Sequence, residues 1–219
     1  MATYPFGRGG FEVSKLEEAT AKRYLPAAEL SKLKSATANN PQCEYARKLF
    51  LFSYYCYGIS FIDMAMLTAA HIKQMEDGDY IVYKRQKIKR QKGVKPISIK
   101  ITPAIRQLIE SLQAASPTVD DFLLPVVTRS GYTGERLYMH IRTRYSKYQK
   151  YLRLLAEELG INFHLTSYVS RHTAAMTLQR NHIPREVISQ MLGHADLETT
   201  NVYLDSFDNG VINEAAKVL

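Results

Sequence analysis

The chain has 219 residues, of which 46% are hydrophobic and 23% are charged, so it can bury a core of ordinary composition. Its 29 Lys and Arg outnumber 21 Asp and Glu, and the formal net charge of +8 favours a polyanionic partner such as nucleic acid. The longest apolar run (residues 47–61) is too short to cross a bilayer, and Cys43 and Cys56 form neither a disulfide framework nor a metal-ligand motif. A membrane-spanning chain and a disulfide-rich secreted domain are therefore excluded.

The N-terminal third predicts a linker followed by helices. Residues 1–22 are Gly-rich and then helix-like without a core of their own, so we expect a linker or arm remnant, with the compact region starting near Leu25. Apolar residues recur at helical spacing from Cys43 and end at Gly58, a residue type that often follows a helix. A second helical stretch, "SFIDMAMLTAAHI", is expected to follow at once.

Two β-rich runs, "GDYIVYKRQ" and "GVKPISIKI", flank a basic turn and predict a hairpin. The turn, residues 84–95, carries seven Lys or Arg and no acid. A solvated turn is the plainer interpretation, but on a hairpin such charge also suits a phosphate backbone. The candidate DNA-binding residues of this basic turn are Lys84, Arg85, Lys89, Arg90 and Lys92.

Thr102-Pro103 predicts the start of the next helix, and residues 116–127 predict a loop with an apolar anchor. Residues 138–159 predict a long amphipathic helix. Its apolar face comprises Ile141, Tyr145, Tyr148, Leu152 and Leu155, and its basic side includes Arg142, Arg144 and Lys147. Two separate basic clusters in one domain favour nucleic acid over a merely solvated surface.

The C-terminal third predicts four more helices. Thr166 or Ser167 caps the first, Pro184 starts a shorter one that ends at Gly193, and Asp196 caps the helix that carries Tyr203. The last dozen residues predict a short helix with a one-sided apolar face. The fold class is therefore mainly α with a small antiparallel β-sheet (α+β).

Four residues suggest chemistry on a phosphodiester. A tyrosine attacks poorly unless cations surround it, the pentavalent phosphate needs Arg, and the leaving oxygen needs a proton from Lys or His. Tyr203, Arg171, Lys87 and His194 offer these groups. Each alone is more often structural, so their order and spacing decide.

The stretch "RHTAAMTLQRNHIPREVISQMLGHADLETTNVYL" resembles the tyrosine recombinase (phage integrase) family over roughly residues 25–219. It contains the family's Arg-His-Thr box, its Leu-Gly-His box, and a Tyr nine residues beyond that His. The resemblance implies the family's catalytic-domain fold and DNA cleavage and rejoining through a 3′-phosphotyrosyl link, with no metal or other cofactor. Arg171 would stabilise the phosphorane, Lys87 would protonate the leaving oxygen, His194 would position the phosphate and Tyr203 would attack it.

Two positions depart from the family pattern. Ser60 stands where the first catalytic arginine is expected, with Asp63 keeping the acid after it, and Tyr168 replaces the histidine three residues before the box arginine. Both substitutions are similar to integrases of Bacteroides-type conjugative transposons. We therefore expect either slow chemistry or a compensating cation from outside the motif, with Arg85 and Arg90 as the nearest candidates.

The resemblance also implies organisation and partners. We expect a catalytic domain at residues 23–219, no N-terminal core-binding domain in this chain, and double-stranded DNA as the substrate. We further expect a homo-oligomer, a tetramer on DNA assembled through the C-terminal helix, acting in the bacterial cytoplasm to integrate or excise a mobile element. Two alternatives stay open: a non-catalytic DNA-binding relative that uses residues 166–192 as a helix-turn-helix, and DNA relaxation of the type IB topoisomerase kind.

Overall fold

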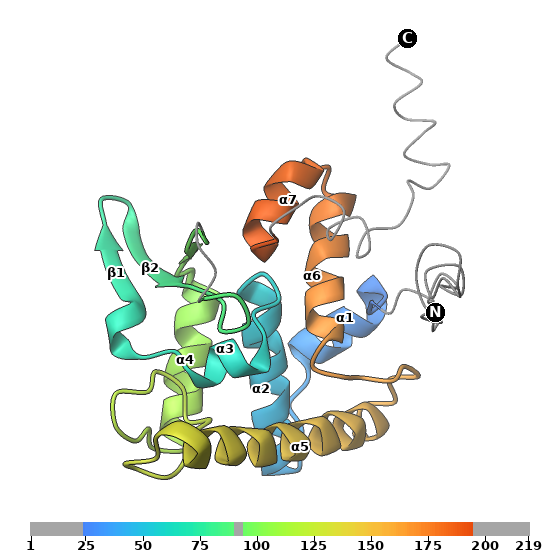
Figure 1. Ribbon diagram of the computed structural model, residues 1–219. Coiled ribbons are helices and arrows are strands. Elements are labelled where there is room, and N and C mark those ends of the chain that lie inside the picture. The colour runs from blue at the N-terminus through green and yellow to red at the C-terminus, as the bar shows by residue number, and fades with distance from the viewer. Residues whose placement is uncertain (1–23, 90–93, 195–219) are drawn as a thin grey trace, which may run out of the picture.

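The computed structural model describes residues 24–89 and 94–194, and it has the expected class: helices around one small antiparallel sheet (Figure 1). The helices are α1 (Ala27–Ser35), α2 (Pro41–Tyr55), α3 (Phe61–Ala65), α4 (Pro103–Ala115), α5 (Gly134–Glu158), α6 (Val169–Arg180) and α7 (Arg185–Leu192). The strands are β1 (Ile72–Met75), β2 (Gly78–Tyr83) and β3 (Ile97–Lys100). No helix in this part of the chain is both long and apolar enough to cross a membrane.

The predicted hairpin is the β2–β3 pair, but the sheet has a third strand that the sequence did not predict. In the order β1-β2-β3, Ile81 of β2 lies opposite Ile72 on one side and Ile99 on the other. The helix expected over "SFIDMAMLTAAHI" is therefore wrong beyond Ala65, where a 3₁₀ turn at Ala69–His71 leads into β1. Three of the four β1 residues are exposed, so this edge strand shows no alternation to distinguish it.

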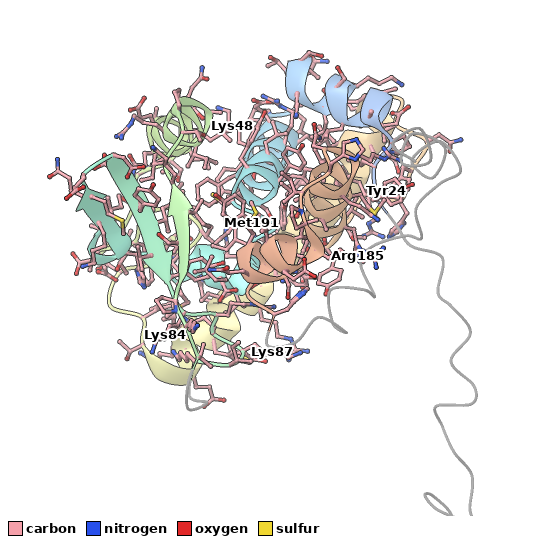
Figure 2. All side chains as sticks on the ribbon, turned by 90° about the horizontal axis from the view of Figure 1, so that it is seen from above. Tyr24, Lys48, Lys84, Lys87, Arg185 and Met191 are labelled. Carbon is pink, nitrogen blue, oxygen red and sulfur yellow. The ribbon has the colours of Figure 1, made fainter. Side chains whose placement is uncertain are left out.

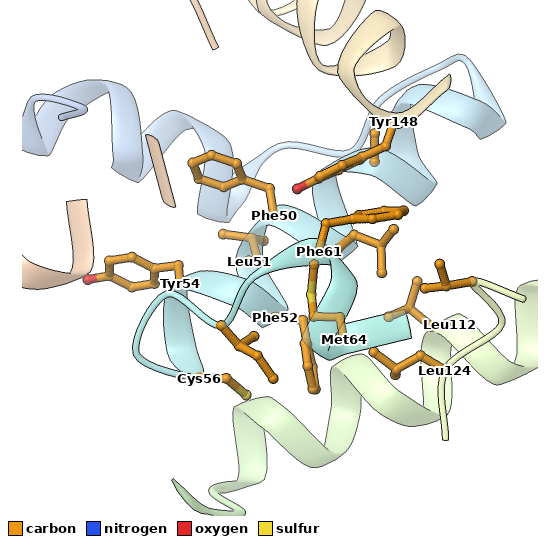
Figure 3. Close-up of a cluster of buried hydrophobic side chains, with 14 of the residues drawn as sticks. Phe50, Leu51, Phe52, Tyr54, Cys56, Phe61, Met64, Leu112, Leu124 and Tyr148 are labelled. Carbon is orange, nitrogen blue, oxygen red and sulfur yellow. The ribbon is translucent and has the colours of Figure 1, made fainter. Parts of the chain in front are cut away.

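The core forms where α2 passes between the other helices. Figure 1 shows α5 running across the bottom of the molecule, where it packs on α2, with the β1–β2 ribbon on the side away from α6. Figure 3 shows the centre of this packing. Phe50 and Phe52 of α2 lie there together with Phe61, Met64, Leu112 and Leu124. The Phe61 ring stacks on Tyr148 of α5 at a centroid distance of 5.2 Å, which joins α3 to α5.

Local chemistry sets most of the helix ends. The Asn40 side chain accepts from Gln42 N–H before Pro41, and Thr102 does the same for Ile105 before Pro103, as expected of an N-cap followed by proline. Helix α7 follows Pro184 and ends at Gly193, as predicted. Helix α6 differs, because Tyr168 is its N-cap residue and neither Thr166 nor Ser167 caps it.

Helix α5 buries most of its predicted apolar face. Ile141, Tyr148 and Leu152 are buried, and the helix begins four residues before the expected start. Tyr145 was assigned to the same face, but 37% of it is exposed. Its ring lies against the outer side of Phe61, 5.3 Å between centroids, at the edge of the core.

The end of α2 and the start of α6 meet at a glycine. Gly58 has a φ of 72°, and a Cβ atom added there would lie 2.4 Å from the Arg171 Cα. Only a residue without a side chain allows this contact, which fixes the position of Arg171 relative to α2. The Ser53 hydroxyl, two residues before the end of α2, also lies 2.7 Å from the Ser170 hydroxyl, so the two helices are joined twice.

We predict that Gly58→Ala lowers the free energy of unfolding by about 2–4 kcal/mol, because it adds overpacking against backbone to the strain of a positive φ. Gly131→Ala is the matched control: its φ is 71° but nothing lies within 4 Å of an added Cβ. Urea denaturation of both variants measures the difference. Equal losses in the two variants would mean that the Gly58–Arg171 contact does not constrain the fold.

Candidate active site

Arg171 is the centre of the candidate site, and two segments far apart in sequence hold it. The side chain extends from α6 and only 4% of the residue is exposed. Its Nη1 donates to the Gly58 carbonyl oxygen at 3.1 Å, and its Nη2 donates to the Leu192 carbonyl and to His194 Nε2. The guanidinium is therefore fixed by the ends of α2 and α7.

The His194 ring accepts a hydrogen bond from Arg171. The Nη2–Nε2 distance is 2.8 Å, and because a guanidinium only donates, Nε2 carries no proton in this arrangement. The backbone holds the ring there: Gly193 ends α7 with a φ of 63°, and His194 N–H donates to the Ser189 carbonyl. A Cβ at Gly193 would collide with Ile97 of β3, so glycine is required for both the turn and the packing.

A second guanidinium lies beside the first. Arg85 follows β2, and its Nη1 donates to the Gly193 carbonyl at 3.2 Å, next to the Arg171–His194 contact. Burial lowers the pKa of Arg171 to about 10, and repulsion from Arg85 contributes in the same direction. Arg171 therefore stays charged at neutral pH, and an anion between the two guanidinium groups would relieve their repulsion.

Arg85 was expected among the DNA-binding residues of the basic turn and also as a candidate for the compensating cation. Arg85 lies at the base of the turn, where the sheet meets α7, and it lines the same cavity as Arg171. It is thus well situated as the compensating cation. Arg90, the other candidate for that role, lies outside the described residues, as does Lys92.

Ser60 joins the site through Asp63. The Ser60 hydroxyl donates to Asp63 Oδ2 at 2.6 Å and accepts from Asp63 N–H at 3.2 Å, so it caps α3. The other carboxylate oxygen, Oδ1, accepts from Gln86 N–H at 2.6 Å. Asp63 is 3% exposed and therefore connects Ser60 directly to the base of the basic turn, one residue after Arg85.

Lys87 is exposed and lies on the turn that Asp63 anchors, immediately after Gln86. Figure 2 shows Lys87 and Lys84 at one edge of the molecule, on the side opposite Lys48. The Lys89 ammonium group donates to the Gln86 side-chain oxygen at 2.6 Å, so the Lys89 side chain lies along the turn. No contact joins Lys87 to Arg171 among the described residues. Its predicted role as the proton donor therefore requires that its side chain reach a bound substrate.

The three predicted basic residues of α5 do not share one surface. Arg142 lines the cavity of Arg171, whereas the Arg144 guanidinium lies 5.9 Å from the centre of the Tyr45 ring. Arg144 and Lys147 both line a separate groove beside Tyr148. The basic face predicted from residue spacing is therefore divided between two sides of the helix.

A cavity of about 420 Å³ opens between α3, α5 and the segment before α6. It is lined by Gly58, Ile59, Ser60, Phe61, Ile62, Arg85, Tyr138, Ile141, Arg142, Tyr145, Ser167, Tyr168 and Arg171. Tyr168, expected at the position of the family's histidine, is 52% exposed on its rim, with its ring edge-on to His172 at 5.1 Å. The cavity thus brings together Ser60, Arg85, Tyr168 and Arg171, with His194 bonded behind them.

Sequence reasoning missed Tyr138 and the exposure of Tyr145. Both are exposed, at 58% and 37%, and both line the cavity with Arg142 between them. Their spacing of four and three residues is a helical stripe, so a search for aromatic residues beside arginines on one helix face would have found them. Tyr203, the predicted nucleophile, lies outside the described residues.

The arrangement is suited to holding an oxyanion, through two adjacent guanidinium groups and a phenol that line one cavity. Among residues 24–89 and 94–194, no group of three or more His, Cys, Asp or Glu side chains could bind a metal ion.

Solved structures with the same fold include recombinases. XerA recombinase superposes with a TM-score of 0.61 at 20% identity, covering 89% of this chain and 64% of that one. The Tn1549 transposon integrase in complex with a circular intermediate DNA also gives 0.61, at 14% identity, covering 95% and 70%. XerH bound to its difH substrate gives 0.61 at 19% identity, covering 89% and 53%.

Sequence comparison gives the same family. A tyrosine recombinase of Pseudothermotoga lettingae is 25% identical over 134 residues, which is 61% of this chain and 42% of the relative. Tyrosine recombinase XerD of Brucella abortus is 30% identical over 121 residues, 52% of this chain and 36% of the relative. The chain therefore spans less than half the length of these relatives. The model of the phage integrase family matches residues 23–209, and the chain belongs to that family.

Proposed function

We propose that this chain cleaves and rejoins DNA strands through a 3′-phosphotyrosyl intermediate, as a site-specific recombinase. The observation that carries the proposal is the buried Arg171 guanidinium, bonded to His194 and adjacent to Arg85 at the mouth of one cavity. A phosphodiester has the charge and size that such a pair of guanidinium groups binds. Membership of the phage integrase family supplies the reaction class.

In the proposed reaction, the Tyr203 phenol loses its proton to water, its oxygen forms a bond to the scissile phosphorus, and the bond between that phosphorus and the 5′ oxygen breaks. Arg171 and Arg85 stabilise the charge on the non-bridging oxygens, where preorganised cations have their largest effect. Lys87 gives a proton to the leaving 5′ oxygen. The Tyr168 phenol donates to a non-bridging oxygen, and His194 orients the phosphate. The covalent link retains the bond energy, so rejoining needs no cofactor.

Arg85 takes the place of the cation that Ser60 does not supply. The Ser60 hydroxyl donates a hydrogen bond to the buried Asp63 carboxylate and also caps α3, so it is already engaged. Arg85 reaches the same cavity from the base of the turn, so the chain brings two guanidinium groups to one phosphate from different elements.

The biological role proposed here is movement of a mobile element of the conjugative-transposon kind, similar to Bacteroides-type integrases, in the bacterial cytoplasm. The likeness to a transposon integrase held with DNA and the +8 charge support it. Residues 23–219 would act as the catalytic unit and residues 1–22 as its linker. A tetramer on double-stranded DNA, joined through residues after 208, would carry out exchange.

The cleavage proposal predicts a covalent protein–DNA adduct. A pool of nicked duplexes of randomised sequence traps it, because the short cleaved fragment diffuses away and prevents religation. We expect Tyr203→Phe to abolish the adduct with DNA affinity nearly unchanged. Arg171→Ala should slow adduct formation by at least about 10²–10³-fold. Binding without any adduct in the unaltered chain would favour a non-catalytic DNA-binding relative, and an adduct with relaxation by monomers would favour a topoisomerase.

Lys87→Ala should slow cleavage, and a substrate with a sulfur leaving atom at the 5′ position should restore the rate, because a thiolate leaves without a proton. Adduct formation on matched oxygen and sulfur substrates measures this. Lys84→Ala and Lys89→Ala are the controls on the same turn and should show no selective rescue. Rescue of a control in place of Lys87→Ala would move the general acid to that residue.

Arg85 should respond to anions together with Arg171. Phosphate should raise the melting temperature of the unaltered chain by about 2–4 °C over chloride at matched ionic strength, which corresponds to roughly 1 kcal/mol of binding. Arg85→Ala should lose most of this shift and cleave about 10²-fold more slowly. Arg106→Ala removes an exposed arginine paired with Asp79 and serves as the control. A full phosphate response in Arg85→Ala would show that Arg85 does not contribute to the anion site.

A further inference from the structure

The cavity between α3 and α5 is larger and more apolar than a phosphate requires. Its volume of about 420 Å³ falls in the range of small-molecule sites, whereas only a few of its lining residues would hold a phosphate. Most of the other lining residues are aliphatic or aromatic, with Ile59, Phe61, Ile62 and Ile141 among them. The proposed cleavage chemistry does not use this part.

We infer that this cavity binds an unstacked nucleobase of the strand next to the scissile phosphate. The inference rests on the proposed function for the identity of that strand. Strand exchange requires bases beside the break to leave their stack, which costs a few kcal/mol per base. A cavity that covers the faces of one such base would offset this cost during the exchange.

The aromatic wall of the cavity is held rigid. The Tyr145 hydroxyl lies 3.1 Å from the Ser167 hydroxyl and accepts from the Gln149 side-chain amide at 3.1 Å. Its ring also packs against Phe61, which is stacked on Tyr148 from the core. A ring fixed in this way offers a stacking surface that needs little ordering when a base binds.

Tyr138 stands one helical turn before Arg142 and two before Tyr145, at the open side of the cavity. At 58% exposure it is the most exposed of the large hydrophobic side chains in the described part of the chain. An aromatic ring at the mouth and a fixed one on the wall suit a flat, apolar-faced ligand. We assign Tyr138 as the ring that covers the inserted base.

The charge of the cavity selects a nucleotide over an apolar peptide. Arg85, Arg142 and Arg171 line it, and none of the lining residues found in the described part of the chain is acidic. A phosphate held by Arg171 and Arg85 would bring its own nucleoside or the adjacent one to the cavity, because successive phosphates of a duplex strand are separated by only about 3.4 Å along the axis. One ligand thus satisfies both ends of the cavity.

The test uses the full chain and two probes: the trinucleotide TTT with a 3′-phosphate, and the same molecule with an abasic central nucleotide. Isothermal titration calorimetry gives both dissociation constants. We expect the base-containing probe to bind roughly 5- to 100-fold more tightly than the abasic one, the range that base–aromatic stacking produces. Tyr138→Ala should remove most of this preference.

Two variants make the result specific to the ring. Tyr138→Phe keeps the stacking face and should keep the preference, and Met139→Ala alters the neighbouring exposed residue, which does not line the cavity. Equal affinity of the unaltered chain for both probes, or an undiminished preference in Tyr138→Ala, would overturn the inference. Tighter binding of both probes by Tyr138→Ala would also overturn it, because the Tyr138 ring would then obstruct the cavity instead of stacking on the base.

The covalent-adduct assay separates this inference from the proposed function. A base preference that depends on Tyr138, in a chain that forms no adduct, would leave the base site standing and remove the cleavage chemistry. An adduct that forms normally without any base preference would do the reverse.

Discussion

The structure depends on one buried cation. Arg171 is held by the carbonyl oxygens of Gly58 and Leu192 and by His194, and carbonyl groups carry dipoles but no net charge. These bonds fix the guanidinium without cancelling its charge. Burying a charge in this way is costly unless its partners are accurately placed, so the ends of α2 and α7 must meet α6 in one arrangement. The glycines at 58 and 193 permit that arrangement, since each lies where a Cβ would collide.

Much of the fold could be predicted because it follows from local chemistry. Helices α2, α4 and α7 begin at a cap or a proline that the sequence displays, and the β2–β3 hairpin follows from two β-rich runs around a basic turn. Strand β1 could not be predicted, because an exposed edge strand needs no alternating pattern and its pairing with β2 is set by tertiary contacts. The partial exposure of Tyr145 could not be predicted, because helical spacing tells which residues share a face but not how far the partner element extends along it.

The candidate site divides in the same way. Arg171 and His194 could be proposed from motif spacing, and the structure joins them by a direct hydrogen bond. Arg85 could be named only as one of two candidates for the compensating cation, because seven similar cations on one turn give no local signal of which of them folds back towards α7. Its placement depends on Asp63, which is 23 residues away from the Gln86 N–H that it binds. Whether Asp63 meets Gln86 depends on how α3 packs, and no local sequence pattern reveals that packing.

The double role of Ser60 has an evolutionary consequence. Its hydroxyl caps α3 and engages the same carboxylate that anchors the turn carrying Arg85. An arginine arising at position 60 would remove that cap, at a cost of about 0.5–2 kcal/mol, and would add a third guanidinium to a cavity that already holds Arg85 and Arg171. Gaining an arginine at position 60 is therefore unfavourable while Arg85 is present. Losing Arg85 first would leave Arg171 as the only one of these two guanidinium groups in the cavity. If Arg85 is the compensating cation, as proposed, positions 60 and 85 are coupled, and a lineage that exchanged one arrangement for the other would be held there by epistasis.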